Sequence, residues 1–390
     1  MKVKRYLNLQ LPLGQSIFLW GPRNSGKSTY LRESFPDSVY YDLLQTDLFL
    51  TLLKEPFKLR EEILQLPSEA LQNPIIIDEI QKVPLLLNEV HWLIENHKPC
   101  HFILCGSSAR KLRAAGTHLL AGRAWSSHFY PLVYSEIDNF SLLRALTHGL
   151  LPTSYFSHQP RRFLKAYIQD YLIEEIQKEG LVRNLAGFSR FLDAMALGHG
   201  EMTNYVNVAR DCGVDAKTVK EYYDILVDTL VGYRLEPFHK LGKRDVITST
   251  PKFYLFDVGV AGFLMNRSIE VLKGKEAGAA FEHWILTELI AYRGLHDLDF
   301  PISYWRTKSD LEVDFILGNG QVAIEVKISS KVAKSDLKGL EAFIEEHHPQ
   351  QAYCVSLAPR ARKLSLSNGS HITELPWQEF IKKLWNKEII

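Results

Sequence analysis

One stretch of sequence decides the fold of the first third of the chain: Ser16-Ile17-Phe18-Leu19-Trp20-Gly21-Pro22-Arg23-Asn24-Ser25-Gly26-Lys27-Ser28-Thr29. Its apolar beginning predicts a buried strand. From Gly21 onward it matches G-x-x-x-x-G-K-[ST], the pattern of a phosphate-binding loop (P-loop). In such a loop backbone N–H groups surround the phosphates of a nucleotide, the Lys27 ammonium reaches the β- and γ-phosphates, and the Ser28 hydroxyl binds Mg²⁺. We therefore predict that Gly21 to Thr29 bind ATP and Mg²⁺, and that a helix from Thr29 points its positive N-terminal end at the phosphates.

A second apolar strand ends in two carboxylates. Residues 73–77 are mostly isoleucine, and Asp78 and Glu79 follow them directly. This order places one acid near Mg²⁺ and another near the attacking water of a nucleotide hydrolase. We predict that Asp78 binds the metal and that Glu79 activates the water. The sequence leaves one alternative open, a buried strand that only ends in solvated acids.

Two further positions are candidates for contact with the γ-phosphate. A third strand over residues 101–105 is followed by Gly106, Ser107 and Ser108. A small polar residue there can sense the phosphate or the lytic water, and Ser107 is the first choice, with Ser108 the second. Arg123 follows a helical segment and can stabilise transition-state charge on the nucleotide of a neighbouring subunit, as an arginine finger does. The alternative for Arg123 is an ordinary surface arginine.

Composition narrows the class of protein. The chain has 390 residues, 46% apolar and 23% charged, which suits two or three packed domains and leaves little room for extended disorder. Its net charge of +1 excludes a global basic field that would attract nucleic acid. Neither a signal peptide nor an apolar run of the roughly 18 residues that span a bilayer is found. We therefore expect a cytoplasmic protein with no membrane partner, whose cysteines are reduced thiols without zinc-binding spacing: Cys100, Cys105, Cys212 and Cys354.

The middle of the chain predicts helices. Apolar residues between Phe163 and Glu179 recur at helical spacing, which favours a helix that packs on its neighbours. Downstream, a short helix from Tyr205, a turn at Gly213, an N-cap at Asp215 and a second helix over 216–230 form a helix–turn–helix pattern.

This pattern indicates a contact with DNA. Strands over residues 233–238 and 252–256 would form the wing of a winged helix. Residues 151–262 hold no obvious basic excess, and winged helices also serve as protein-contact modules, so a protein partner is the alternative. The candidate phosphate contacts are Lys217 and Lys220 on the second helix, and Lys240, Lys243 and Arg244 in the wing.

The C-terminal third carries acids in a suggestive order. Asp314 lies in one predicted strand, and Glu325 and Lys327 lie in the next. Period-two alternation puts Glu325 and Lys327 on the same face, where Asp314 can join them. An acid followed by E-x-K resembles the restriction-endonuclease-like fold; in an active nuclease the acids would hold Mg²⁺ and the lysine would help to activate water. Glu282 or Glu288 on the preceding helix would complete the set. The alternative is that Lys327 only neutralises Glu325.

Residues 10–140 resemble the P-loop module of AAA+ ATPases. The motif Leu120-Ala121-Gly122-Arg123 is similar to one in a prokaryotic branch of that family, whose members carry a C-terminal domain of unknown function. Further motifs follow in the order seen in that branch: Tyr254-Leu255-Phe256-Asp257-Val258-Gly259, Phe281-Glu282, Trp305-Arg306, Glu312-Val313-Asp314-Phe315 and Glu325-Val326-Lys327. The resemblance implies an ATPase with a nuclease-like accessory fold that assembles as a homo-oligomeric ring, a hexamer by analogy with AAA+ proteins.

The predicted fold class is α/β with three parts. Residues 1–140 form an AAA+ P-loop module with a parallel sheet, residues 141–262 a helical and winged-helix region, and residues 263–390 an α/β restriction-endonuclease-like domain. The predicted function is Mg²⁺-dependent ATP hydrolysis that acts on DNA, with branched DNA such as a Holliday junction favoured by analogy with ring ATPases. Two alternatives remain open, an ATP-gated metal-dependent endonuclease and a nucleotide-switched interaction protein.

Overall fold

The computed structural model describes residues 3–12, 14–97, 100–108, 110, 112, 120–172, 184–239, 246, 249–366 and 369–390. The chain divides into two compact units. Unit 1 consists of residues 1–132 together with 228–231, and unit 2 of residues 133–227 together with 232–390. The predicted α/β class with an N-terminal parallel sheet is confirmed.

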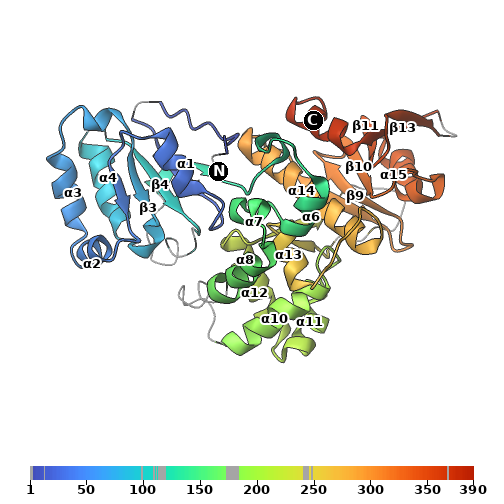
Figure 1. Ribbon diagram of the computed structural model, residues 1–390, viewed down its shortest axis with the longest axis horizontal. Coiled ribbons are helices and arrows are strands. Elements are labelled where there is room, and N and C mark those ends of the chain that lie inside the picture. Colours follow the sequence, from blue (N-terminus) through green and yellow to red (C-terminus); the bar gives the residue numbers. More distant parts are fainter. Residues whose placement is uncertain are drawn as a thin grey trace. The chain divides into compact units, whose positions relative to one another are not determined.

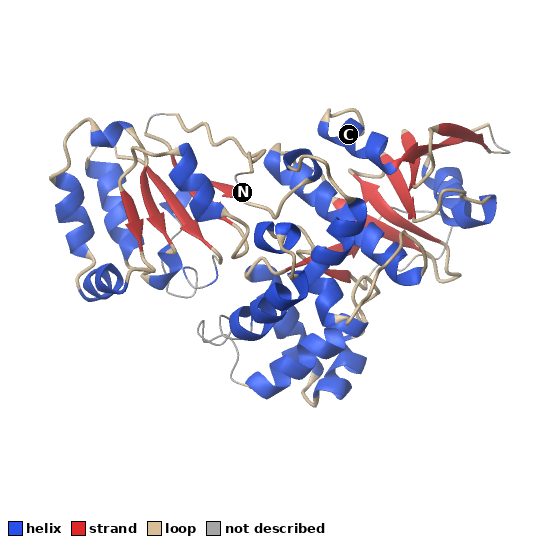
Figure 2. Ribbon diagram, viewed as in Figure 1, coloured by secondary structure: helices blue, strands red, loops and turns tan. Residues whose placement is uncertain are grey.

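Unit 1 is built on a five-stranded sheet in the order β2-β3-β4-β1-β5, and all its strand pairs are parallel. The helices α3 and α4 cover one face of this sheet and α1 lies on the other (Figure 1, Figure 2). The strands are β1 (Ser16–Trp20), β2 (Tyr40–Asp42), β3 (Ile75–Asp78), β4 (Phe102–Gly106) and β5 (Ala124–His128). The helices are α1 (Lys27–Ser34), α2 (Thr46–Lys54), α3 (Phe57–Leu64) and α4 (Leu86–Asn96).

The strand order explains why the motifs of unit 1 meet. Strands β1, β3 and β4 are buried along their whole length, as expected for apolar strands in a sheet that helices cover on both faces. They are neighbours in the sheet and run in the same direction, so their carboxyl ends lie at one edge. The P-loop, Asp78 and Ser107 follow these three ends, and an edge of this kind is where open α/β sheets bind ligands.

A short segment from late in the chain completes unit 1. Residues 228–231 begin at the last residue of α12 (Ala216–Asp228), the second helix of the helix–turn–helix, yet they belong to unit 1. Leu230 packs against the apolar core of this unit, and Asp228 forms an ion pair with Arg110 at 2.6 Å.

Unit 2 contains an eight-stranded sheet in the order β12-β13-β11-β10-β9-β8-β6-β7. Its strands are β6 (Gly232–Pro237), β7 (Lys252–Leu255), β8 (Ile302–Arg306), β9 (Glu312–Leu317), β10 (Val322–Lys327), β11 (Gln351–Ser356), β12 (Arg362–Ser365) and β13 (His371–Pro376). Its helices are α6 (Leu142–His148), α7 (Pro152–Phe156), α8 (Pro160–Ala166), α10 (Leu185–Leu197), α11 (Tyr205–Cys212), α12 (Ala216–Asp228), α13 (Val258–Leu264), α14 (Lys275–Leu295), α15 (Lys338–His347) and α16 (Trp377–Trp385).

The sequence predicts a domain boundary between residues 262 and 263, whereas the structure places both sides of this boundary in unit 2. Strands β6 and β7 pair with each other in antiparallel fashion, as a wing would. Strand β6 also pairs in parallel with β8 and so joins the C-terminal sheet. A boundary between residues 262 and 263 therefore cuts across one continuous sheet.

The predicted helix–turn–helix is present in α11 and α12. Gly213 adopts φ +67° between the two helices, and the Asp215 side chain accepts a hydrogen bond from the Thr218 N–H at 2.9 Å. The predicted helix over 163–179 is described only as far as Leu172. Helix α8 ends at Ala166, a π-helical turn (Tyr167–Leu172) follows, and residues 173–183 lie outside the described part.

Helices α6 and α13 are held together by one buried acid. Asp257 caps α13 and accepts a hydrogen bond from the Leu150 N–H at 2.6 Å. The helices approach so closely that a Cβ atom at Gly259 would lie 2.5 Å from both the Gly149 nitrogen and the His148 oxygen. Only glycine fits there, so this contact fixes the spacing of the two helices.

All four cysteines are buried and unpaired. Among the helices of the described residues, none is long and apolar enough to cross a membrane.

Candidate nucleotide-binding site

The P-loop connects β1 to α1 through two left-handed residues. Asn24 has φ 58° and Gly26 has φ 99°, which turns the chain sharply before α1 starts at Lys27. Gly21 passes close to the end of β5, where a Cβ atom would lie 2.3 Å from the Phe129 oxygen. The loop of Gly21 to Thr29 therefore has the tight turn that a phosphate cradle requires.

Lys27 is folded back onto the loop. Its ammonium donates hydrogen bonds to the Gly21 oxygen at 2.6 Å and to the Pro22 oxygen at 2.9 Å, and the residue is 5% exposed. Burial lowers the pKa of Lys27, while the neighbouring Cys105, Glu79 and Asp78 act in the opposite direction. The triphosphate of a nucleotide would offer this buried cation negatively charged oxygens in place of two neutral carbonyls.

Ser28 and Asp78 meet as predicted for a metal site. The Ser28 hydroxyl donates a hydrogen bond to Asp78 Oδ2 at 2.6 Å. A hydroxyl and a carboxylate oxygen are ligands that Mg²⁺ accepts, and P-loop enzymes hold the ion through a residue pair of this kind. The donor set therefore fits Mg²⁺.

Tyr40 is a member of this group that sequence reasoning did not find. Its hydroxyl donates a hydrogen bond to Asp78 Oδ2 at 2.6 Å. Burial, together with the neighbouring Asp78, raises the pKa of Tyr40, so its proton stays in place. The contact depends on β2 lying beside β3, where Tyr40 pairs with Ile76, and no local pattern in the sequence reveals that order.

Glu79 sits in a hydrogen-bonded chain. Its backbone is left-handed, with φ 60°, and its Oε2 accepts a hydrogen bond from Gln81 Nε2 at 2.6 Å. The same Gln81 nitrogen contacts Ser107 Oγ at 3.1 Å, and Arg23 of the P-loop donates to Glu79 Oε2 at 3.2 Å. The sequence analysis did not identify Gln81 as a site residue. Its position two residues after Glu79 is the one feature of the sequence that could have indicated the contact. The structure thus joins Glu79 to the first-choice sensor Ser107 and to the P-loop.

Ser108 and Arg123 point away from this group. The Ser108 hydroxyl contacts the Asp228 oxygen at 3.4 Å. Arg123 forms an ion pair with Glu95 of α4. Because Ala124 pairs with Ser16, Arg123 lies beside the amino end of β1, at the opposite edge of the sheet from the P-loop. An arginine-finger role would therefore require the nucleotide of another subunit, and it stays a prediction.

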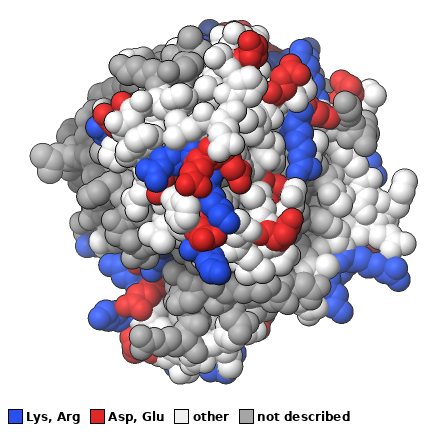
Figure 3. All heavy atoms as spheres, turned by 90° about the vertical axis from the view of Figure 1, so that its left-hand side faces the viewer, with Lys and Arg blue, Asp and Glu red and all other residues white. Residues whose placement is uncertain are grey.

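The predicted DNA-contacting residues fall in two groups. Lys217 and Lys220 are exposed on α12, whereas Lys240, Lys243 and Arg244 lie outside the described residues. Residues 205–228 hold five acids against three bases: Asp211, Asp215, Glu221, Asp224 and Asp228 against Arg210, Lys217 and Lys220. On the visible face of unit 1, Lys and Arg lie intermixed with Asp and Glu (Figure 3). None of these described surfaces shows a basic field.

The predicted C-terminal acids come together on β9 and β10. Asp314 is buried and accepts a hydrogen bond from the Val326 N–H at 2.7 Å. Glu325 pairs with Lys327 at 2.6 Å, and its other oxygen, Oε2, is buried without a hydrogen-bond partner. Burial raises the pKa of Glu325 to about 7, and Lys327 opposes that shift.

Lys252 on β7 joins these acids, and the sequence did not suggest it. Its ammonium pairs with Glu312 and lies 3.8 Å from Glu282, which also accepts a hydrogen bond from the Tyr254 hydroxyl at 2.6 Å. Within the described part of the chain, no three His, Cys, Asp or Glu side chains are placed so as to hold a metal ion.

Glu288 lies away from this group. It accepts hydrogen bonds from the Tyr134 N–H at 2.8 Å and from the Trp385 indole at 2.9 Å. Of the two helix acids that the sequence offered, the structure therefore favours Glu282.

Three family models match successive parts of the chain. Residues 14–138 match the family described as AAA domain. Residues 139–270 match a Domain of unknown function (DUF8612), and residues 277–378 match a Domain of unknown function (DUF4143). Residues 14–138 thus form a P-loop domain of the AAA type, and the restriction-endonuclease-like character of the C-terminal part stays a prediction.

Similar proteins add little about activity. Uncharacterized proteins of Mycobacterium bovis and Mycobacterium tuberculosis are each 27% identical over 326 residues, which cover 80% of this chain and 70% of theirs. A solved structure, the Signal Transduction ATPase with Numerous Domains (STAND) protein with a tetratricopeptide repeat sensor from Pyrococcus horikoshii, is 14% identical. That match covers 73% of this chain and 47% of the other, with a TM-score of 0.20.

Proposed function

We propose that this protein, whose residues 14–138 form an AAA-type P-loop domain, is a Mg²⁺-dependent ATP hydrolase. One observation carries the proposal. Lys27, the Ser28–Asp78 pair and Glu79 lie together at the carboxyl edge of the sheet in unit 1. Positioned cations and oxygen ligands of this kind supply most of the catalysis in phosphoryl transfer.

Each of these side chains has a separate task in hydrolysis. Backbone N–H groups of the P-loop and the Lys27 ammonium bind the β- and γ-phosphates and offset their charge. Ser28 and Asp78 would hold Mg²⁺, which neutralises charge that develops on the phosphate oxygens. Glu79 accepts a proton from the attacking water, and Gln81 and Ser107 fix the direction of its carboxylate.

Arg23 links phosphate binding to the base. It belongs to the loop that surrounds the phosphates, and it donates to the same Glu79 oxygen that Gln81 contacts. A bound γ-phosphate competes for this guanidinium because a phosphate carries more charge than one carboxylate. We infer that nucleotide binding draws Arg23 toward the phosphates and leaves Glu79 free to contact water.

The first test is steady-state phosphate release from ATP by the full chain. We expect ATP turnover with Mg²⁺ and none above background in excess EDTA. Ser28 and Asp78 cannot neutralise the phosphate charge themselves and act on the phosphates through the ion that they would hold. Equal release with and without the metal would contradict the proposal.

The same assay, repeated with DNA, addresses the partner. Turnover would be compared without DNA and with single strands, duplex and a four-way junction at one salt concentration, because phosphate contacts weaken steeply as salt rises. The helix–turn–helix with the exposed Lys217 and Lys220 favours DNA as the binding partner. The acidic residues around these lysines weigh against a DNA contact. Stimulation by the junction would support remodelling of branched DNA by an oligomeric ring. Indifference to every DNA favours a nucleotide-switched interaction protein.

A second candidate function is metal-dependent nucleic-acid cleavage in unit 2. Buried acids with shifted pKa values are common at functional sites; Asp314 and Glu325 are two such acids, and the half-buried Lys327 pairs with Glu325. The unpartnered Oε2 of Glu325 and the carboxylate oxygens of Asp314 are ligands of the type that Mg²⁺ accepts, although Lys252 already supplies a positive charge beside Glu282 and Glu312. The residues thus suit either a nuclease site or a closed ion-pair network.

Cleavage can be separated from ATP hydrolysis by substitution. We expect Asp314→Asn and Glu325→Gln to abolish Mg²⁺-dependent cutting of supercoiled plasmid and single-stranded RNA while ATP turnover stays within about twofold, because these residues lie in unit 2. Both substitutions keep the shape of the side chain, and the amide that replaces the Asp314 carboxylate retains an acceptor for the Val326 N–H. Glu345→Gln, at an exposed position on α15, serves as control. Normal cutting by both variants would assign the group to structure alone.

A further inference from the structure

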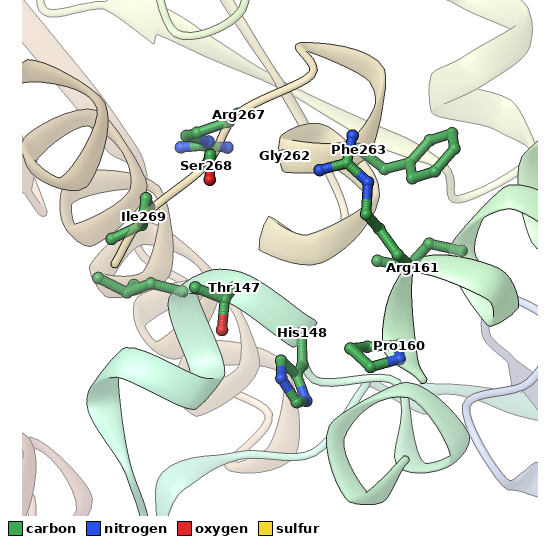
Figure 4. A pocket seen from close by; sticks show the side chains of 11 residues that line it. Thr147, His148, Pro160, Arg161, Gly262, Phe263, Arg267, Ser268 and Ile269 are labelled. Atoms are coloured by element: carbon green, nitrogen blue, oxygen red, sulfur yellow. The ribbon is translucent and has the colours of Figure 1, made fainter. Parts of the chain in front are cut away.

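Unit 2 contains a cavity that is lined by none of the site residues discussed above. Helices α6, α8 and α13 and residues 267–269 surround it, and its volume is about 230 Å³ (Figure 4). It lies entirely within the part of the chain that matches a domain of unknown function. This size is below that of pockets for drug-sized ligands, roughly 300–1,000 Å³, and suits a small molecule.

The wall of the cavity holds a buried cation with no direct ion pair. Arg267 is 8% exposed, and among the described residues no carboxylate forms an ion pair with its guanidinium. Its Nε and Nη2 atoms are buried without hydrogen-bond partners, and Nη1 makes one long contact of 3.5 Å with the Glu276 oxygen. Burial lowers the pKa of Arg267 to about 10, although the nearby Glu276 acts in the opposite direction, so the group remains charged at neutral pH. A buried charge with unused donors calls for an anionic partner.

Two further nitrogen-bearing side chains line the cavity, an exposed arginine and a half-buried histidine whose pKa is lowered by burial. Arg161 reaches it from α8, where its guanidinium is held by Asn266 Oδ1 at 2.5 Å, and His148 reaches it from α6 with a buried Nδ1 that has no partner (Figure 4). The described lining contains no Asp or Glu. The nearby Glu276 accepts from the Ser268 N–H at 3.3 Å, and its carboxylate does not pair with Arg267.

Gly262 leaves space beside the guanidinium. A Cβ atom at this position would lie 3.5 Å from Arg267 Nε and 3.6 Å from Nη2. The Nε–Nη2 edge is the side of arginine that grips a carboxylate or phosphate with two hydrogen bonds. The absence of a side chain at residue 262 therefore leaves room next to the two unused donors.

We propose that this cavity binds a small organic oxyanion, whose phosphate or carboxylate group pairs with Arg267 and whose apolar part lies against Leu146, Leu164 and Phe263. The lining offers a partner for each part of such a ligand. Two arginines and a histidine face its anionic group, and aliphatic and aromatic side chains face its apolar part. The site is separate from the P-loop and needs no nucleotide.

Calorimetric titration of the full chain tests the site. The probes are phenyl phosphate and benzoate, which separate phosphate from carboxylate recognition, and benzyl alcohol as the neutral analogue. We expect saturable binding of at least one anion and none of the alcohol. Arg267→Met should weaken that binding by about tenfold or more, since a charge-assisted pair is lost. Arg162→Met on α8, an exposed arginine that does not line the cavity, is the matched control and should bind as the wild type does.

Gly262→Ala tests the same site independently, in case the Arg267→Met variant does not fold. Its new methyl group meets Arg267 at ordinary contact distance and favours the helix, so the fold should persist while the anion is excluded. Lys27→Ala should retain anion binding. If the P-loop were the site that held the phosphate probe, this variant would lose the binding instead. Anion binding that survives both Arg267→Met and Gly262→Ala, binding lost only in Lys27→Ala, or no anion binding at all would overturn the proposal.

Discussion

Replacing Lys27 by alanine is expected to lower ATP turnover by on the order of 10²- to 10³-fold, the usual cost of removing one positioned group that stabilises transition-state charge. The ammonium is buried in the P-loop and held by the Gly21 and Pro22 oxygens, so neither water nor another cation can readily take its place. Alanine leaves the loop carbonyls facing the phosphates without a positive charge. Phosphate release and the affinity for a fluorescent ATP analogue both measure the loss.

A matched lysine makes this result specific. The Lys58 side chain on α3 is 40% exposed and pairs with Glu55 at 2.7 Å. Exposed pairs of this kind contribute little, so Lys58→Ala should keep the turnover and stability of the wild type. If Lys27→Ala hydrolysed ATP as fast as Lys58→Ala, the P-loop of this chain would not be a catalytic site, and the ATPase proposal would fail with it.

The sequence predicted that the P-loop, Asp78 and Glu79 lie together because its signals for them are local. A strand, a glycine-rich turn and a lysine at the start of α1 lie within residues 16–29, and Asp78 and Glu79 directly follow a strand of their own. What the sequence could not predict was the order of strands in the sheet. Tyr40 reaches Asp78, and Gln81 reaches Ser107, only because β2, β3 and β4 are neighbours.

The same limit explains the differences in unit 2. The spacing of Asp314, Glu325 and Lys327 predicted their proximity because β9 and β10 are consecutive and antiparallel. Lys252 is distant from Glu282 and Glu312 in sequence, and it meets them only through the fold. The cavity beside Arg267 likewise involves α6 and α13, whose close approach Gly259 permits and which no periodicity of the sequence reveals.

Glu79→Gln is expected to separate ATP binding from hydrolysis. Turnover should fall by about 10²- to 10⁴-fold, the usual contribution of a general base, because the amide cannot accept a proton from water. The affinity for Mg–ATP should change much less, since Lys27, Ser28 and Asp78 are untouched. Glutamine keeps the length of the side chain and an oxygen that can accept from Arg23 and Gln81. Phosphate release and analogue binding are measured side by side, with Glu69→Gln at an exposed position as control.

The contact between Arg23 and Glu79 can be tested by a second substitution, Arg23→Ala. If Arg23 only restrains Glu79, Arg23→Ala should leave the base as free as a bound phosphate would, and turnover should hold or rise. If Arg23 instead also binds the γ-phosphate, as its place in the P-loop indicates, Arg23→Ala should lower turnover, and by less than Glu79→Gln because Lys27 still supplies charge. Full turnover in Glu79→Gln would exclude Glu79 as the base. The ion pair at 3.2 Å would then be a structural contact, and water activation would have to come from another group at this edge of the sheet.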